Sequence, residues 1–209
     1  MSFEIIVLEC GQGWCAVGKV YARIDDRLRS FIEAQKVFFV ASAPLSGSGH
    51  VNISPKGRAG SLAVLGEDEL AYLDFGGSHA ETLAHLRENG RIALMWCAFE
   101  GPPKVLRVHG RGEPVFRDDP RWAELVRRFG DADAPGLRAI VVVRAERISD
   151  SCGFAVPFMD YREERTLHAD HFGRKTDEEF AAYCESKEHN GISIDGLPAL
   201  PLPLPARTS

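Results

Sequence analysis

Polar side chains alternate with apolar ones along a short segment that ends at a lysine and a glycine. Asn52 and Ser54 fall on one face of the predicted strand, because successive side chains of a strand point to opposite sides. Val51 and Ile53 fall on the other face. Lys56 follows at the turn, so the segment offers two hydrogen-bonding side chains and one cation beside an apolar surface.

A second segment brings backbone donors to one point. The predicted strand at residues 69–74 runs into Gly76, Gly77 and Ser78 and then opens a helix. The first N–H groups of a helix have no intrahelical partner, and they suit a negatively charged group such as a phosphate. This segment therefore predicts a phosphate site.

A basic strand that carries Lys104 and Arg107 follows these two segments. One anionic ligand could collect the cations and donors of all three. The competing interpretation is a solvent-facing strand edge with ordinary turn residues. Each motif alone leaves both interpretations open, and the coincidence of two strand ends favours the anion site.

Other chemistries lack their motifs. The sequence has no third glycine after Gly11 and Gly13 for a dinucleotide-binding turn, no Gly-Lys-Ser/Thr phosphate loop and no Gly-x-Ser-x-Gly nucleophile turn. His168 and His171 have no companion motif, which indicates surface histidines, and we predict no metal site. Cys97 lies in an apolar strand, where a free cysteine mostly packs as a small hydrophobic residue.

Strand and helix patterns that could position these groups follow one another along the chain. The strand patterns lie at residues 37–43, 49–54, 61–65, 69–74, 91–99, 104–116 and 139–148. The helical patterns lie at residues 22–35, 79–88, 121–129 and 176–188. Short turns join most of the strands, so we expect a mainly β (α+β) fold whose six to seven antiparallel strands close into a barrel.

Composition and charge restrict the class of protein. The chain has 209 residues, of which 44% are hydrophobic, and no apolar run approaches the roughly 20 residues that span a bilayer. Its formal net charge of -5 opposes binding to nucleic acid. The five cysteines form neither an even set nor a Cys-x-x-Cys pair, so we expect a reducing, cytoplasmic location.

We expect one domain with an extension at each end. Residues 1–17 form an N-terminal extension, residues 18–150 the barrel, and residues 151–209 a C-terminal extension with a helix. The proline-rich tail at residues 197–205 should be extended, because proline donates no backbone hydrogen bond. This tail could cover a partner subunit or remain in solvent.

Four runs of the sequence are similar to those of a known family. They are Phe38 to Pro44, His50 to Gly57, Ala71 to Leu94 and Cys97 to Gly112. Through these runs the chain, from about Ile24 to Ile148, resembles the pyridoxamine 5'-phosphate oxidase-related family of FMN-binding split β-barrels. Residues 151–153 and 193–198 resemble a subgroup of proposed oxidases. The resemblance implies a Greek-key split barrel and a homodimer with two FMN molecules in clefts between the subunits.

The resemblance also assigns positions to the cofactor. Positions within residues 52–56 match the strand that meets the flavin ring edge and the phosphoribityl chain. Positions within residues 74–82 match the stretch that holds the phosphate. With the cation of the basic strand added, the cofactor-binding residues that we predict are Asn52, Ser54, Lys56, Asp74, Ser78, His79, Thr82 and Arg107.

Two departures from the family pattern affect the expected substrate. The oxidases present an arginine at the position of Asn52 and a Ser-Arg-Lys run where this chain has Ser78, His79 and Ala80, so the phosphate site here is less cationic. The Trp and Arg of their substrate-binding region have no counterpart in residues 149–209. The resemblance thus implies an FMN-dependent oxidoreductase that acts on an unidentified small molecule rather than on vitamin B6.

Two alternatives to this function stay open. The same fold could hold a deazaflavin or heme. The protein could also be a non-catalytic flavin-binding or sensing module that acts through its partners. No catalytic acid or base is assigned, and His50, His109 and Cys152 are candidates only by type and by expected nearness.

Overall fold

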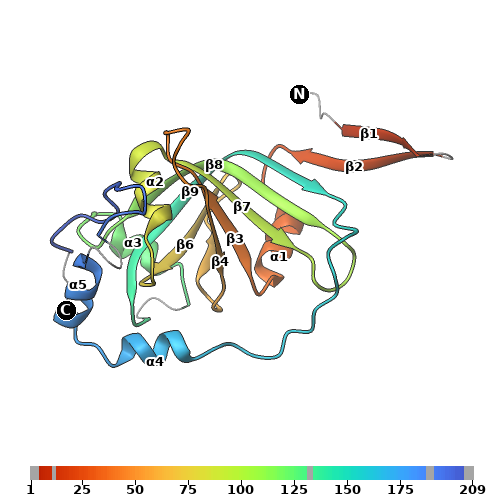
Figure 1. Ribbon diagram of the computed structural model, residues 1–209. Coiled ribbons are helices and arrows are strands. Elements are labelled where there is room, and N and C mark those ends of the chain that lie inside the picture. Colours follow the sequence, from red (N-terminus) through yellow and green to blue (C-terminus); the bar gives the residue numbers. More distant parts are fainter. Residues whose placement is uncertain (1–4, 11–12, 131–133, 187–190, 205–209) are drawn as a thin grey trace.

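The N-terminal residues form a hairpin in the computed structural model, which describes residues 5–10, 13–130, 134–186 and 191–204. β1 (Ile5–Cys10) pairs with β2 (Gly13–Tyr21), and the end of β2 pairs with β9 (Leu137–Ser151). Figure 1 shows this hairpin projecting from the body of the molecule. The extension expected at residues 1–17 thus contributes strands that the sequence patterns did not predict, while residues 1–4 and 11–12 lie outside the described chain.

The barrel strands lie close to the predicted segments. They are β3 (Phe38–Ser42), β4 (Asn52–Lys56), β5 (Leu62–Val64), β6 (Glu69–Phe75), β7 (Arg91–Cys97), β8 (Val105–Val115) and β9. They pair in the order β5-β6-β9-β8-β7-β3-β4, and every pair is antiparallel. The predicted antiparallel split barrel is confirmed.

The barrel is open between two strands that follow each other in the chain. β4 and β5 are the end strands of the pairing order, and no ladder joins them in the described residues. The loop at residues 57–61 links the two strands across this opening. Lys56, the last residue of β4, lies at this opening.

Capping residues fix the ends of the two helices that flank the barrel. α1 (Asp26–Ala34) begins after Asp25, whose carboxylate accepts the Leu28 N–H at 2.8 Å. α2 (Glu81–Asn89) ends at Gly90, whose φ of 71° lies in the left-handed region that favours glycine. α1 lies within the predicted segment 22–35, and α2 is shifted slightly toward the C-terminus relative to the predicted 79–88.

Three further helices complete the described chain. They are α3 (Trp122–Val126), α4 (Leu167–Gly173) and α5 (Asp177–Glu185). α5 begins with the predicted capping box, in which Thr176 and Glu179 exchange hydrogen bonds. α4 was not predicted, because it is short and has no side-chain cap at its start. No helix in the described ranges is long and apolar enough to cross a membrane.

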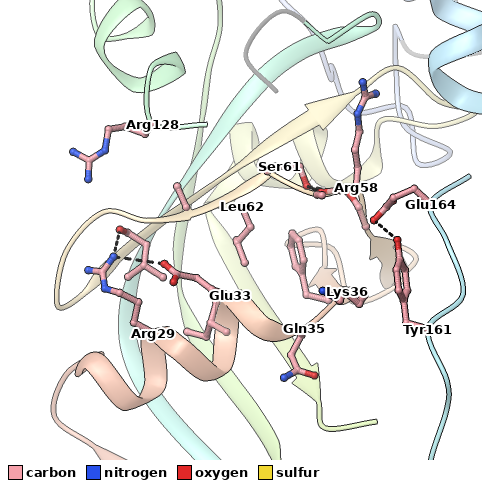
Figure 2. Close-up of a pocket in the computed structure, with 17 residues that line it drawn as sticks. Arg29, Glu33, Gln35, Lys36, Arg58, Ser61, Leu62, Arg128, Tyr161 and Glu164 are labelled. Atoms are coloured by element: carbon pink, nitrogen blue, oxygen red, sulfur yellow. Dashed lines mark hydrogen bonds and ion pairs between the residues drawn. The ribbon is translucent and has the colours of Figure 1, made fainter. Parts of the chain in front are cut away.

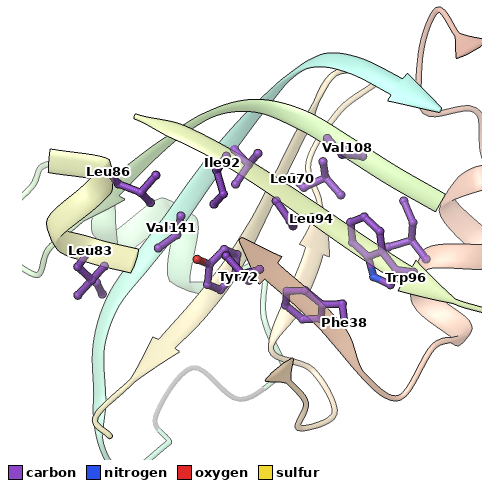
Figure 3. Packing of buried hydrophobic residues seen from close by; sticks show 14 of the residues in the cluster. Phe38, Leu70, Tyr72, Leu83, Leu86, Ile92, Leu94, Trp96, Val108 and Val141 are labelled. Atoms are coloured by element: carbon purple, nitrogen blue, oxygen red, sulfur yellow. The ribbon is translucent and has the colours of Figure 1, made fainter. Parts of the chain in front are cut away.

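Aromatic side chains fill the centre of the barrel (Figure 3). Phe38 stacks on Trp96 with ring centroids 5.8 Å apart and meets Tyr72 edge to face at 5.7 Å. All three rings are buried. Rings of this size dominate the energy of a core, so they hold β3, β6 and β7 together from within.

The C-terminal helices pack against the turn between β6 and α2. Phe172 and Phe180 are buried in the main core. A Cβ atom at Gly76 would lie 2.8 Å from the Phe172 ring, so only glycine allows this approach. The Tyr183 hydroxyl donates a hydrogen bond to the Gly77 carbonyl at 2.7 Å. The C-terminal extension is therefore part of the wall around the predicted phosphate turn.

The last described segment, residues 191–204, lies against the barrel of its own chain. Leu200 is buried in the main core. The Ile194 N–H donates to the Glu81 carboxylate at 3.1 Å, in the first turn of α2. The proline-rich tail thus begins as a packed segment, and residues 205–209 lie outside the described chain.

Candidate functional site

A cavity of about 900 Å³ opens where the barrel is split. It lies between the end of β4, the end of β6 and the segment that carries α4. Sites for small molecules commonly measure roughly 300–1,000 Å³, so the cavity is large enough for a cofactor. The lining residues with basic side chains are Lys56, Arg58, His79, Arg138, Arg165 and His168.

One buried carboxylate holds two cations in the wall of this cavity. Asp74 accepts from Lys56 Nζ at 3.0 Å and from Arg138 Nε at 2.7 Å. Burial raises the pKa of Asp74, but the charges of Arg138 and Lys56 outweigh burial and hold this pKa below its usual value. Two positive charges against one negative charge leave the cluster with a net charge of about +1.

Arg138 is a residue that the sequence analysis missed. It lies on β9, its side chain is buried, and its Nη2 donates to the His79 carbonyl at 3.2 Å. The sequence does contain one indication of this role. Arg138 is the single charged residue in the apolar run from Leu137 to Val143, and a buried charge requires a partner of opposite charge. Arg138 thus brings a cation to the backbone of His79. His79 lies in the segment that the sequence analysis matched to a Ser-Arg-Lys run of the oxidases.

The glycine turn after β6 contributes backbone to the site. Gly76 and Gly77 line the cavity, and a Cβ atom at Gly77 would meet no atom within 4 Å. His168 Nε2 lies 2.8 Å from the Gly76 carbonyl oxygen, and burial lowers the pKa of this imidazole. His79 lines the cavity, whereas Ser78 is not among its lining residues.

The polar face of β4 points toward α2. Asn52 Nδ2 donates to Thr82 Oγ1 at 2.9 Å, and Ser54 Oγ donates to Asn52 Oδ1 at 3.3 Å. The structure therefore joins three of the predicted cofactor residues in one chain of hydrogen bonds. They continue the row that ends at Lys56, although they do not line the cavity themselves.

The apolar face of β4 points outward. Val51 is 70% exposed and Ile53 is 68% exposed. The predicted alternation of the strand is present, but its apolar side is directed away from the barrel and its polar side faces α2. The reason is that β4 is an end strand whose inner face meets the polar first turns of that helix.

Arg107 does not join the other predicted residues. It lies on β8, and its Nη1 donates to Ser151 Oγ at 3.0 Å. Strand register places it across from Met95, which itself lies across from Phe39 on the outward face of the sheet. Arg107 is not among the residues that line the cavity.

The candidates His50, His109 and Cys152 do not line the cavity, and neither does the buried His85. His50 Nδ1 lies 2.7 Å from Asp195 Oδ1, on the surface beside the C-terminal segment. His109 is exposed on the outward face of β8. His85 is buried with Nδ1 3.0 Å from Ser42 Oγ, and burial lowers the pKa of its ring. No group of three His, Cys, Asp or Glu side chains in the described chain is arranged to hold a metal ion.

The cavity wall suits a ring with an anionic tail. Its apolar part is formed by Val37, Pro55, Leu73 and Phe75, which could contact a planar aromatic ring. Its charged part contains the cations Lys56, Arg58, Arg138 and Arg165 and the carboxylates Glu163 and Glu164. The fold and the cavity together define a split-barrel protein with a cavity at the opening of the barrel.

Comparison with known proteins agrees with this class. The family model described as pyridoxamine 5'-phosphate oxidase matches residues 24–152. The chain is 36% identical over 192 residues to the pyridoxamine 5'-phosphate oxidase family protein ustO of Aspergillus flavus, which covers 86% of this chain and 77% of that protein. The chain belongs to the pyridoxamine 5'-phosphate oxidase family.

Solved structures with a similar fold include proteins with different ligands. An FMN-binding protein from Syntrophomonas wolfei is 19% identical, with a TM-score of 0.44, over 57% of this chain and 80% of that chain. HutZ, a heme storage protein from Vibrio cholerae, is 17% identical, with a TM-score of 0.45, over 61% of this chain and 93% of that chain.

Proposed function

We propose that the protein binds FMN in the cavity at the barrel opening and acts as an oxidoreductase on a small molecule. The observation that carries the proposal is the cluster of Lys56, Asp74 and Arg138 beside the apolar wall of this cavity. A flavin combines a flat aromatic ring with a phosphate, and the cavity offers a surface for each. A bound flavin would supply hydride or electron transfer.

The residues of the chain have distinct tasks in this proposal. Lys56 is the cation with the more accessible side chain, 21% exposed against 3% for Arg138, and it contacts the anionic or electron-rich part of the ligand. Asp74 and Arg138 position Lys56 and keep the wall positively charged. Leu73 and Phe75 exclude water from the ring, which strengthens the charged contacts.

The substrate in this proposal differs from a vitamin B6 phosphate. The chain has His79 and Ala80 where the family pattern has Arg and Lys, and Arg138 restores only one buried cation. A dianionic phosphate on the substrate in addition to that of FMN would have fewer cations to meet it.

We also propose that the protein is a homodimer. Ile53 on the outward face of β4 is exposed, as are Val51 directly before this strand and Leu45, which is 64% exposed in the loop between β3 and β4. Exposed apolar groups on and beside an end strand favour an isologous contact with a second copy. Arg107 lies on the same outward side of the sheet, where a partner could bring it to the cofactor.

A titration with FMN tests the proposed cofactor. We expect saturable quenching of flavin fluorescence, and we expect Lys56→Ala to weaken FMN binding by roughly tenfold or more, because a charge-assisted hydrogen bond is lost. Arg144→Ala is the matched control, since it removes one exposed cation of β9 that does not line the cavity. Its affinity for FMN should equal that of the unchanged protein.

Other results would point to the alternatives. No quenching at high micromolar FMN would end the proposal. Saturable binding of a deazaflavin or of heme without binding of FMN, seen in the absorption band of each ligand, would replace FMN as the cofactor. Bound FMN that neither NADH nor NADPH reduces would favour the non-catalytic module.

A further inference from the structure

A second cavity lies on the other side of the loop that links β4 to β5 (Figure 2). Its volume is about 540 Å³, and the proposed FMN site makes no use of it. α1 forms one wall, with Arg29 and Glu33, and the segment with Tyr161 and Glu164 forms the opposite wall. The cavity is therefore a separate compartment at the same opening of the barrel.

Positive charge exceeds negative charge around this second cavity. The charged lining residues are Arg29, Lys36, Arg58, Arg128, Glu33 and Glu164. Four of these are cations and two are carboxylates, which gives a formal surplus of two positive charges. Such a surplus favours an anionic ligand.

Both carboxylates have a polar partner in the cavity wall, whereas two of the cations have no ion pair in the described chain. Glu164 accepts from the Tyr161 hydroxyl at 3.0 Å, and Glu33 lies 3.9 Å from Arg29. Lys36 approaches the Tyr161 ring at 5.5 Å but has no ion pair within the described chain. Arg128 likewise has no ion pair there. Lys36 and Arg128 can therefore turn to a ligand without breaking a salt bridge to any residue that the structure describes.

The floor of the second cavity is apolar. Ile32 and Phe38, which belong to the main core, line it together with the half-buried Leu62. An apolar floor with a cationic rim suits a molecule that has an apolar body and an acidic group. An inorganic anion alone would leave the floor without a partner.

The two cavities share a wall. Gly57, Arg58, Ala59 and Glu164 line both of them. Arg58 has a φ of 84°, a left-handed conformation that is rare for a residue with a side chain, and its guanidinium lies 4.8 Å from the centroid of the Phe75 ring in the larger cavity. A ligand in the second cavity would thus lie next to a ligand in the first.

We propose that the second cavity binds a small organic acid, with a carboxylate on an apolar body, and that this acid is the substrate class of the flavin site. The assignment as substrate rests on the proposed function, whereas the binding of the acid does not. The acidic group meets Lys36 and Arg128, and the apolar body lies over Leu62 and extends toward the shared wall.

Benzoate is a suitable probe, with benzamide as its neutral counterpart. Titration followed through the backbone amide signals of residues 57–63 should show saturable shifts with benzoate and none with benzamide. Lys36→Ala combined with Arg128→Ala should weaken benzoate binding roughly tenfold, because two charged contacts at exposed positions are lost. This double variant and the unchanged protein should bind FMN equally, since neither residue lines the larger cavity.

Lys19→Ala combined with Arg144→Ala is the matched control, because it removes the same charge from positions that line neither cavity. It should bind benzoate as the unchanged protein does. The proposal is overturned if benzoate does not saturate, if benzamide binds equally well, or if the Lys36 and Arg128 variant keeps full affinity. If FMN fails to bind while benzoate behaves as expected, the flavin function fails and the acid site stands.

Discussion

Asp74 holds Lys56 and Arg138 together, and this makes the cluster sensitive to acid. The carboxylate is fully buried, and its two cations keep its pKa below the usual value of 3.8. A group whose pKa is lower in the folded than in the unfolded protein contributes stability above the unfolded pKa. That contribution is lost as the pH falls from about 4 through the folded pKa.

We predict that Asp74→Asn lowers the free energy of unfolding at pH 7 by about 3–5 kcal/mol, because it leaves Arg138 buried without its charge partner. The variant should also lose less stability than the unchanged protein between pH 5 and pH 3. Urea unfolding across this range measures both effects. Asp68→Asn, which removes an exposed carboxylate 3.8 Å from Arg144, should cost less than about 0.5 kcal/mol. Equal costs for the two variants would contradict the role given to Asp74.

The turn from β6 into α2 is the element where the C-terminal helices meet the barrel. Phe172 of α4 and Phe180 of α5 both approach Gly76, at 2.8 and 3.0 Å from the place of a Cβ atom. The next glycine, Gly77, has open space at that position. Two adjacent glycines of one turn therefore differ in what a methyl group would meet.

We predict that Gly76→Ala destabilises the protein by about 1–3 kcal/mol, because the added methyl group overpacks the contact with two aromatic rings. Gly77→Ala should leave the free energy of unfolding within about 0.5 kcal/mol of the original. The midpoint of urea unfolding separates the two variants. If Gly76→Ala were as stable as Gly77→Ala, α4 and α5 would not be packed on this turn as described.

The outward face of strands β4, β3, β7 and β8 is the surface through which we expect two copies of the molecule to contact each other. Strand register aligns Ile53, Ala41, Ala93 and His109 across four neighbouring strands, and the face that they share points outward. Small residues at the middle of this row leave a surface that a second copy could approach closely. The proposed homodimer would bury it.

We predict that Ile53→Asp converts the dimer into a monomer, because a carboxylate in an apolar two-fold contact would be buried without a partner. Light scattering after size-exclusion chromatography measures the mass. Leu167→Asp is the control, since Leu167 is similarly exposed, at 71% against 68%, but lies on α4. A monomeric unchanged protein, or a dimer that survives Ile53→Asp, would refute the proposed contact.

The periodicity of the chain by itself determined most of the barrel. Strand positions such as residues 69–74 and 104–116 were predictable because side chains of a strand alternate and turn residues bound each segment. α4 was not, because its seven residues lack a cap and are held mainly by the packing of Phe172. Helices of this length depend on tertiary contacts rather than on their own sequence.

The sequence also determined which side chains of β4 lie on the same face of the strand, and it predicted Lys56 and Asp74 as site residues. Only the tertiary structure decided that Arg138 joins them and that Arg107 does not. The reason is that a local pattern fixes the face of a strand on which a side chain lies, but not which distant strand that face will meet. β9 reaches the Asp74 carboxylate through a pairing with β6 that spans more than sixty residues of chain, and no local signal encodes that contact.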